Sequence, residues 1–388
     1  MMSLEGIRVL DLARGGPGCY CSMLMGDLGA DVTMVEVPVG ASRGLKKNVD
    51  EKERVFWPLN RNKKSIALNL KLPAAKDAFL KLAKDVDVVI DAFRPGVLDR
   101  LGIGYEQVRK LNKRVIYCAF TSYGQYGPYS NLPGHDINFI SLGGALGLIR
   151  RNGEPPVLPP NIIGDFAGGG LFGAFAIMVA IVAREKTGSG QYIDMSVTDG
   201  VTSLLTMPAA PMFAPGVVLA GDGVLQGKTP AYNIYECADG KFIAFGTGEP
   251  QFWKQLCEVL KCEQYIGQEA NKAMRDEIIS YLRKKLKEKT RDQWFEIMRH
   301  KEIGVAPVLD LNEVFEDQHM KARGMLLEFK HPEYGTIRQV GIAPKFSDTP
   351  GSVRSLGPKF GENTDEMLKS VGYSAAQIAE MRTSGAIA

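Results

Sequence analysis

The sequence predicts an α/β protein with a parallel sheet, together with a smaller α+β domain. Residues 7–37 give the first indication, because an apolar run, a glycine turn, a helical stretch and a second apolar run follow one another there. This is the pattern of a βαβ unit, which requires parallel strands. Strand-like and helical stretches continue to alternate as far as residue 122, and the composition changes only after residue 205.

Domain boundaries are predicted where the composition changes. Residues 206–227 are rich in proline, alanine and glycine and are typical of a linker. Residues 228–325 contain a hairpin signal and charged helical stretches, which predict the small domain. We expect residues 1–205 and 326–388 to form the large domain.

The overall composition is that of an ordinary soluble enzyme. The 388 residues are 45% hydrophobic and 23% charged, with a formal net charge of +3. This charge is too small to indicate a nucleic acid or a membrane surface, although a weakly basic balance suits an anionic small molecule. We therefore expect a small-molecule substrate, with no nucleic acid and no membrane as partner.

Cysteine usage and the two termini indicate a cytoplasmic location. The six cysteines form no CxxC pair and no zinc-like pattern with the four histidines, so we expect reduced, mostly buried thiols and no metal site. The N-terminal MMSLEGIRVL lacks the basic and long apolar regions of a signal peptide, and the C-terminal SGAIA is not a peroxisomal signal.

The first predicted elements surround a glycine turn. Strands are expected at residues 7–12 and 32–37, with a helix over residues 19–28 between them. The connecting turn, ARGGPG, has a glycine spacing that differs from GxGxxG. A nicotinamide cofactor is therefore not expected.

Basic residues precede one of the next predicted strands and follow another. Strands are expected at residues 60–70, 86–93 and 115–122, and an amphipathic helix at residues 73–84. The basic turn that opens the 60–70 segment has two open interpretations, a solvated turn or a phosphate contact. Arg94 and Arg100 lie in the loop after the 86–93 strand, and ligands of open parallel sheets gather at such carboxyl ends.

The strongest candidates for chemistry lie in residues 134–183. His135 stands in GHDINF, and Asp165 directly precedes FAGGGLFGAFAIMVAIVA, a run of eighteen residues without a charge. This run reaches the lower length of a transmembrane helix. Its four glycines and the chain's near-zero mean hydropathy favour a helix buried on all sides against a sheet.

His135 and Asp165 each have a structural and a functional interpretation. An aspartate before a helix can be an N-cap, and a single histidine is often structural. Together they are two titratable groups that a fold can bring across one pocket, which is what proton-transfer chemistry needs.

The second half of the chain opens with a strand and a helix start over residues 188–205. Residues 238–240 are the turn of a predicted hairpin, and Glu249-Pro250 begins a helix, because proline suits the first turn and glutamate the cap region.

Several separated motifs then resemble one family. From near residue 6 to near residue 370 the chain contains, in order, DLGADVTMVEVP, FRPGVLDRLGIG, TSYGQYGP, GHDINF, GDFAGG, GSGQYIDMSVTDG, ECADGKFIAFGTGEPQFW and TPGSV…GENTDEML. This set is similar to the superfamily of family III CoA-transferases and α-methylacyl-CoA racemases. The resemblance implies an interlocked homodimer whose Rossmann-like large domain, built from both chain ends, binds a coenzyme A thioester.

The resemblance also implies roles for three residues. In the transferase branch an aspartate matched by Asp165 is the nucleophile that forms a covalent thioester. In the racemase branch that aspartate and a histidine matched by His135 are the two acid–base groups, and a glutamate matched by Glu249 is held close to the histidine. GHDINF, GDF and GEPQFW favour the racemase branch. We therefore expect inversion of the α-carbon of 2-methylacyl-CoA thioesters through an enolate, with CoA transfer between carboxylic acids as the alternative.

The same resemblance assigns residues to the coenzyme A groove. Lys71 and Arg100 are the expected phosphate contacts, and no cofactor is expected beyond the coenzyme A of the substrate itself. The expected groove residues are Leu68, Asn69, Leu70, Lys71, Ala92, Phe93, Arg94, Pro95, Gly96, Arg100, Gly134, Asp136, Ile137, Asn138 and Phe139.

Two features depart from the racemase pattern. Val37 stands where racemases of this kind carry an arginine, so we expect that one CoA contact is either lost or supplied from elsewhere, by Arg61 or Lys63. The C-terminal segment KFSDTPGSVRSLGPKFGENTDEML is more similar to the transferase branch.

Overall fold

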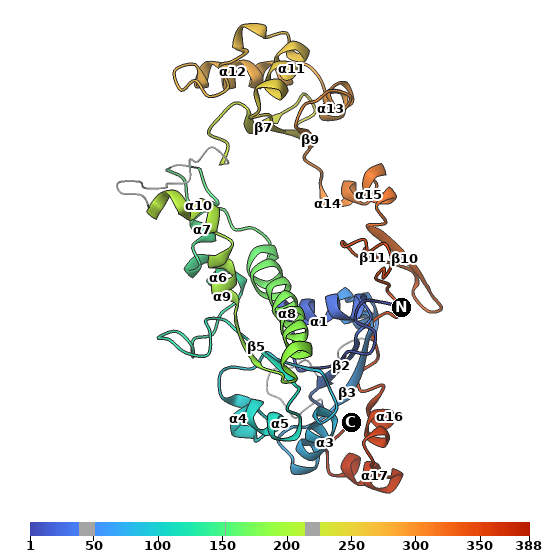
Figure 1. Ribbon diagram of the computed structural model, residues 1–388. Helices are drawn as coiled ribbons and strands as arrows, with labels where there is room; N and C mark the ends of the chain where they lie inside the picture. The colour runs from blue at the N-terminus through green and yellow to red at the C-terminus, as the bar shows by residue number, and fades with distance from the viewer. Residues whose placement is uncertain (39–50, 152, 214–225) are drawn as a thin grey trace. The chain divides into compact units, whose positions relative to one another are not determined.

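A computed structural model describes residues 1–38, 51–151, 153–213 and 226–388 (Figure 1). Its contacts divide the chain into two compact units. The larger unit comprises Met1–Leu146, Leu158–Pro208 and Ala322–Ala388, and the smaller unit comprises Gly147–Val157 and Ala209–Lys321. Gly147–Val157 was expected in the large domain but belongs to the smaller unit, and most of the expected linker, residues 214–225, lies outside the described residues.

The larger unit is built on a six-stranded sheet in the order β3-β2-β1-β4-β5-β6. All five strand pairs are parallel, which confirms the predicted α/β fold. The strand order reverses between β1 and β4, and open parallel sheets form a crevice at the carboxyl ends of such strands. The strands are β1 (Arg8–Asp11), β2 (Asp31–Glu36), β3 (Lys63–Ala67), β4 (Val88–Asp91), β5 (Ile116–Thr121) and β6 (Tyr192–Ser196).

Helices cover both faces of this sheet, because its central strands are apolar on both sides. Successive strand residues point to opposite faces, so Val9 joins one buried cluster and Leu10 the other, and Val88 and Val89 divide in the same way. Residues of α1 and α8 belong to the cluster of Val9, and residues of α3, α5 and α17 to that of Leu10. The helices are α1 (Gly16–Asp27), α3 (Pro73–Ala83), α5 (Tyr105–Leu111), α8 (Phe172–Thr187), α16 (Thr364–Ser370) and α17 (Ala375–Thr383).

The apolar run after residue 161 begins as a π-helix, η2 (Ile162–Leu171), and continues as α8. Its glycines let neighbouring backbones approach closely. A Cβ on Gly169 would lie 2.5 Å from the Cβ of Pro17, and one on Gly168 would lie 2.9 Å from the backbone nitrogen of Val201. The start of α1 and the helix α9 (Val197–Ser203) therefore pack directly against η2.

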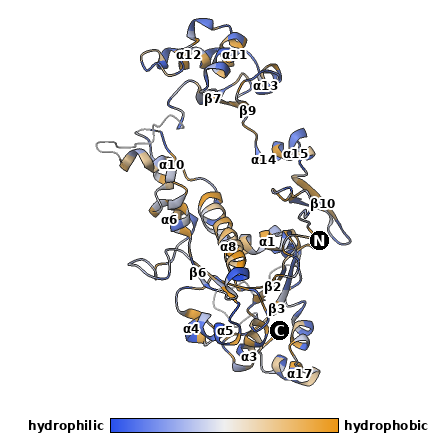
Figure 2. Ribbon diagram, viewed as in Figure 1, coloured by the Kyte–Doolittle hydropathy of each residue, from blue (hydrophilic) through white to orange (hydrophobic). Residues whose placement is uncertain are grey.

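The prediction that this helix is buried on all sides is wrong. The ribbon of this helix is coloured largely as apolar (Figure 2), and four of its large apolar side chains, at helical spacing, are exposed. Their exposed fractions are Leu171 54%, Phe175 63%, Val179 50% and Val182 58%. Only the opposite side, including Ile177 and Ala180, packs on the sheet. Within the described residues, Ile162–Thr187 is the one helix whose length and apolar composition would allow it to cross a membrane.

The C-terminal segment returns to the sheet of the larger unit. A hairpin of β10 (Leu326–His331) and β11 (Gly335–Val340) precedes it. Arg61 donates to the carbonyl of Val340 at 2.7 Å, and Asn62 to that of Ser352 at 3.0 Å. Ile387 then bridges Leu68 beside the edge strand β3 and is buried in the core of the larger unit.

The smaller unit combines an antiparallel sheet with helices around its own core. The predicted hairpin is present as β7 (Tyr232–Glu236) and β8 (Phe242–Gly246), and β9 (Val305–Pro307) pairs with β8. The helices are α11 (Pro250–Leu260), α12 (Arg275–Leu286), α13 (Arg291–Met298) and α14 (Leu311–Val314). Trp253, Tyr235 and Cys257 are buried between sheet and helices.

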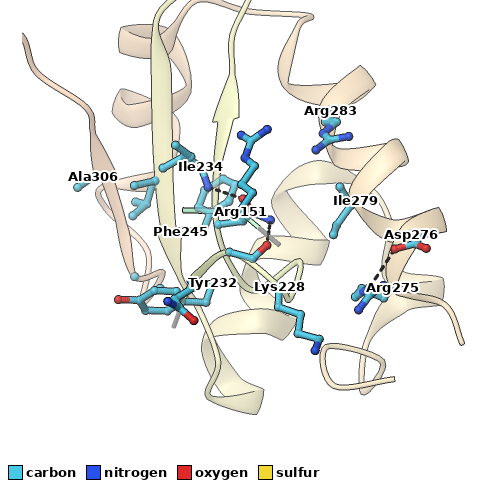
Figure 3. A pocket seen from close by; sticks show the side chains of 17 residues that line it. Arg151, Lys228, Tyr232, Ile234, Phe245, Arg275, Asp276, Ile279, Arg283 and Ala306 are labelled. Carbon is cyan, nitrogen blue, oxygen red and sulfur yellow. Dashed lines mark hydrogen bonds and ion pairs between the residues drawn. The ribbon is translucent and has the colours of Figure 1, made fainter. Parts of the chain in front are cut away.

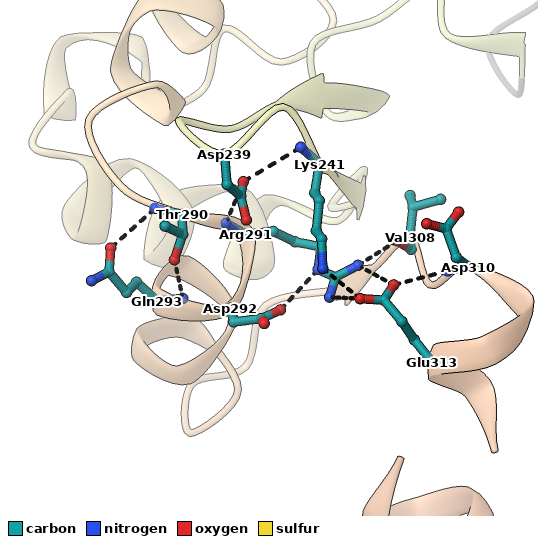
Figure 4. Close-up of polar contacts among 9 residues, drawn as sticks. All are labelled: Asp239, Lys241, Thr290, Arg291, Asp292, Gln293, Val308, Asp310 and Glu313. Carbon is teal, nitrogen blue, oxygen red and sulfur yellow. Dashed lines mark hydrogen bonds and ion pairs between the residues drawn. The ribbon is translucent and has the colours of Figure 1, made fainter. Parts of the chain in front are cut away.

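An ion-pair network joins these elements of the smaller unit (Figure 4). Glu313 accepts from Arg291 at 2.8 Å and 3.0 Å and from Lys241 at 2.5 Å. Arg291 also donates to the carbonyl of Val308 at 2.8 Å. Hydrogen bonds from Arg291 and Lys241 hold the pKa of Glu313 well below its usual range.

Short elements complete the described chain. They are α2 (Glu51–Phe56), η1 (Pro58–Asn60), α4 (Val97–Leu101), α6 (Asp136–Leu142), α7 (Ala145–Leu148), α10 (Thr206–Ala209), η3 (Ala210–Phe213), η5 (Glu263–Tyr265) and α15 (Gln318–Ala322). All six cysteines are free and buried, as the sequence predicted.

Candidate functional site

A cavity of about 350 Å³ lies where the strand order of the parallel sheet reverses. The turns that follow β1, β4 and β5 form three of its walls, and the start of α6 and η2 close it. Ligands of open α/β sheets bind in this position. The lining residues are Arg14, Gly15, Gly16, Pro17, Ala92, Phe93, Arg94, Pro95, Phe120, Thr121, Ser122, Ser130, Leu132, Gly134, His135, Phe139, Asp165 and Val197.

The structure brings His135 and Asp165 together on the wall of this cavity. Other predicted residues that line it are Ala92, Phe93, Arg94, Pro95, Gly134 and Phe139. Gly96 lines a neighbouring cavity with Asp91 and Tyr117. Leu68 and Leu70 are core residues, so their side chains do not reach the cavity. Asn69, Lys71, Arg100, Asp136, Ile137 and Asn138 are absent from its lining.

Asp165 lies in the first turn of η2 and does not cap it. The N-cap position is Asn161, whose side-chain amide donates to Asp165 Oδ2 at 3.1 Å. π-Helical turns are frequent at functional sites. Burial raises the pKa of Asp165 and the Asp136 carboxylate raises it further, while the Asn161 hydrogen bond and His135 oppose them. The net shift favours the protonated acid, which is the form a proton donor needs.

Gly16 holds the other side of the Asp165 carboxyl group. It has a positive φ of 44°, and a Cβ at this position would lie 3.2 Å from Asp165 Cγ. A side chain here would therefore press on the carboxyl group. The glycine turn after β1 therefore allows the backbone to lie close to Asp165. The loose similarity of this turn to a dinucleotide motif did not indicate that role.

His135 is exposed in the cavity and occupies the N-cap position of α6. Its backbone N–H donates to Asn138 Oδ1 at 3.0 Å. The next residue, Asp136, is buried and accepts the Asp165 backbone N–H at 2.7 Å. A Cβ on Gly164 would lie 2.6 Å from Asp136 Oδ2, so this contact depends on glycine there. Asp136 therefore holds the start of α6, which carries His135, against the first turn of η2, which carries Asp165.

Glu249 belongs to the smaller unit, where it is exposed at the N-cap position of α11. Its side chain makes no capping hydrogen bond. The expected contact between Glu249 and His135 stays a prediction.

Of the two alternatives for the contact missing at Val37, its supply by Arg61 or Lys63 is wrong. Arg61 is buried and ion-paired with Asp27 at 2.5 Å. Lys63 is buried and ion-paired with Asp11 at 3.1 Å. Both cations are already neutralised by these buried carboxylates, because a buried cation needs a partner of opposite charge.

A second, larger cavity of about 1010 Å³ lies in the smaller unit (Figure 3). Four basic side chains line it, from Arg151, Lys228, Arg275 and Arg283. Its one acidic lining residue, Asp276, is ion-paired with Arg275 at 2.9 Å. This lining has no pair of groups suited to acid–base chemistry, so the cavity of His135 and Asp165 is the catalytic candidate.

Sequence analysis did not single out several of the lining residues, Arg14 and Gly16 above all. They lie in the turn after the first strand, far in sequence from His135 and Asp165. The position of this turn between a predicted strand and a helix could have indicated these residues, because the turns after parallel strands meet at one edge of a sheet.

Comparison with known proteins identifies relatives of two kinds. The profile of CoA-transferase family III matches residues 4–364. The chain is 34% identical to the human alpha-methylacyl-CoA racemase, across 98% of this chain and 97% of the relative. It is 32% identical to the succinyl-CoA–L-malate CoA-transferase beta subunit of Chloroflexus aurantiacus, with the same coverage of 98% and 97%. A crystal structure of a CAIB/BAIF family protein from Brucella suis has a TM-score of 0.81 at 25% identity, covering 95% of this chain and 99% of that one.

Proposed function

We propose that this chain, which belongs to CoA-transferase family III, is a racemase that inverts the α-carbon of 2-methylacyl-CoA thioesters. The observation that carries the proposal is the placement of His135 and Asp165 on the wall of one cavity at the carboxyl ends of β1, β4 and β5. Inversion needs two acid–base groups, one for each face of the carbon atom.

The chemistry assigns opposite protonation states to the two groups. The hydrogen next to a thioester carbonyl is a weak acid, so its removal needs a base in contact and donors for the enolate oxygen. Neutral His135 takes the proton from one face while protonated Asp165 delivers a proton to the other, and the reverse reaction exchanges these roles. The raised pKa of Asp165 supports its role as the acid.

Backbone donors are available near the developing charge. Asp165 lies in the first turn of η2, where N–H groups lack helical partners, and its own N–H is bound by Asp136. Gly16 begins α1 directly against the same carboxyl group. Two helix starts therefore lie beside the Asp165 carboxyl group, and helix N-termini favour negative charge such as that of an enolate oxygen.

The coenzyme A moiety of the substrate is proposed to lie along the residues after β4. Phe93 and Arg94 line the cavity, and Arg100 follows on α4. Glu249 is proposed to support His135 by hydrogen bonding. No further cofactor enters the reaction, because proton transfer through an enolate requires none.

CoA transfer between carboxylic acids is the alternative, favoured by the similar identities of both kinds of relative. The Asp165 carboxylate would attack the thioester carbonyl, form an anhydride and release CoA as thiolate. The thiolate would then attack the Asp165 carbonyl of the anhydride, giving an enzyme thioester and releasing the first carboxylate. A second carboxylic acid would accept CoA by the reverse steps.

The apolar side of α8 supports a homodimer. Leu171, Phe175, Val179 and Val182 follow one another at helical spacing and are half exposed or more. A contiguous exposed apolar surface of this kind marks an interaction site. We propose that a second copy of the chain covers it.

Substitution of the two acid–base groups tests the proposed function. Asp165→Ala should remove activity in either reaction. His135→Ala should lower α-proton exchange by roughly 10²–10⁴-fold, while it would only weaken a transferase. Exchange is measured by proton NMR in deuterium oxide, and CoA transfer by chromatography of the thioesters. Full exchange by His135→Ala would disprove the two-base assignment.

A further inference from the structure

Arg14 is a cation in the cavity wall that the proposed proton transfer does not use. It lies in the turn after β1, two residues before the glycine that contacts Asp165. Its Cζ atom is 5.1 Å from the ring centre of Phe93, which lines the same cavity. We infer that Arg14 binds a phosphate group of coenzyme A, an inference that rests on the proposed acyl-CoA site.

The charge of Arg14 has no partner in the described chain. Among the residues that the structure describes, no side chain or backbone group forms a hydrogen bond or ion pair with its guanidinium. Glu36 is the carboxylate whose charge acts on it. That carboxylate is held by both terminal nitrogens of Arg54, at 2.9 Å and 2.7 Å, and by the hydroxyl of Ser65.

The surroundings of Arg14 favour an anionic ligand. The Arg14 side chain is accessible to solvent, although it lies in the wall of the cavity. Partial desolvation lowers the pKa of Arg14, and the charge of Glu36 opposes this effect. An arginine remains charged under these conditions. Arg94 lines the same cavity and adds a second cation.

The direction of the side chain favours a phosphate over the reacting end of the substrate. The guanidinium lies beside Phe93 in the turn after β4. It also interacts electrostatically with Glu36 at the end of β2. The charges that act on Asp165 are those of Asp136 and His135. Arg14 therefore lies on the β2 and β4 side of the cavity, where Val37 and the buried Arg61 and Lys63 offer no cation.

Guanidinium geometry suits phosphate. Its planar array of N–H groups forms paired hydrogen bonds with phosphate oxygens. Coenzyme A has two groups with such phosphate oxygens, the diphosphate and the 3′-phosphate. Both are present in free CoA, so the contact can be measured without any acyl group and without turnover.

The test compares the Kd values of CoA and 3′-dephospho-CoA by titration calorimetry for the wild type, Arg14→Gln, Arg14→Lys and Arg109→Gln. Arg109 is the matched control, because its guanidinium also lies over an aromatic ring, that of Tyr105 at 5.7 Å, but outside the cavity lining. Arg14→Gln should weaken CoA binding by roughly 10- to 100-fold, the effect of losing charge-assisted hydrogen bonds. Arg14→Lys should give a smaller loss, and Arg109→Gln none.

The two ligands distinguish the phosphate that is bound. If Arg14→Gln weakens CoA and 3′-dephospho-CoA equally, Arg14 binds the diphosphate. If only CoA weakens, Arg14 binds the 3′-phosphate. An unchanged Kd for CoA in folded Arg14→Gln and Arg14→Lys, with the wild type binding normally, would overturn the inference alone. A wild type that binds neither ligand would contradict the proposed function as well.

Discussion

The position of the Asp165 carboxyl group depends on the absence of a side chain at Gly16. Its φ of +44° is costly for any residue with a Cβ, and that Cβ would lie 3.2 Å from the Asp165 carboxyl carbon. Gly16→Ala should therefore lower kcat by roughly tenfold or more, since small displacements of a catalytic group are expensive. The strain should also cost roughly 1–2 kcal/mol of unfolding free energy.

Gly6→Ala is the control for strain alone. Gly6 has a φ of +90°, and no atom lies within 4 Å of the position that a Cβ would occupy there. This variant should lose comparable stability in thermal unfolding and keep its kcat. Equal kcat values for both variants would show that Gly16 does not position Asp165.

Asp91 makes stability depend on pH. Burial raises the pKa of Asp91 to about 6, although the Phe93 N–H at 2.8 Å and Tyr117 at 3.2 Å donate to it. The folded pKa lies above the unfolded value of about 4. The folded state therefore binds more protons, and stability falls as pH rises from about 4 to about 6, by roughly 1–3 kcal/mol.

Asp91→Asn removes this dependence. The variant should gain stability relative to the wild type at pH 8, by roughly 1–2 kcal/mol, and lose that advantage at pH 4. Urea unfolding of both proteins at the two pH values measures the change. The same difference at both pH values would show that folding does not raise the pKa of Asp91.

The helix α8 is the element whose surroundings the sequence did not reveal. Its apolar residues occur on all sides, which predicted complete burial, yet one side packs on the sheet and the other is exposed. A sequence shows that a surface is apolar but not whether the same chain or a second one covers it. The strands were easier to predict, because residues such as Val9 and Leu10, buried on opposite faces of the sheet, require only local apolar runs between turns.

A charge on the exposed side of α8 should disrupt self-association. Val179→Glu and Val182→Glu should convert a dimer into a monomer in sedimentation velocity at micromolar concentration, because an unpaired carboxylate is costly in an apolar interface. Leu111→Glu on α5 is the control, since Leu111 is 49% exposed but lies outside this apolar row. A dimer that survives both α8 substitutions would place the interface elsewhere.

For the molecule as a whole, the site was predicted in part from the family resemblance and in part from topology. His135 and Asp165 came from motifs, and both line one cavity in the structure. Arg14 could not be found in this way, because its position in the cavity follows from β1 and β4 being neighbours in the sheet. The failure of Arg61 and Lys63 as ligand contacts has a similar origin, since only the fold shows that Asp27 and Asp11 already neutralise them.

The choice between proton transfer and CoA transfer decides what the whole protein does. The decisive measurement is proton NMR of one enantiomer of a 2-methylacyl-CoA with the wild-type protein in deuterium oxide, without an acceptor acid. We expect the α-proton signal to disappear together with the optical purity of the thioester. Retention of both, with CoA transfer once a second carboxylic acid is added, would contradict the racemase proposal and make Asp165 a nucleophile.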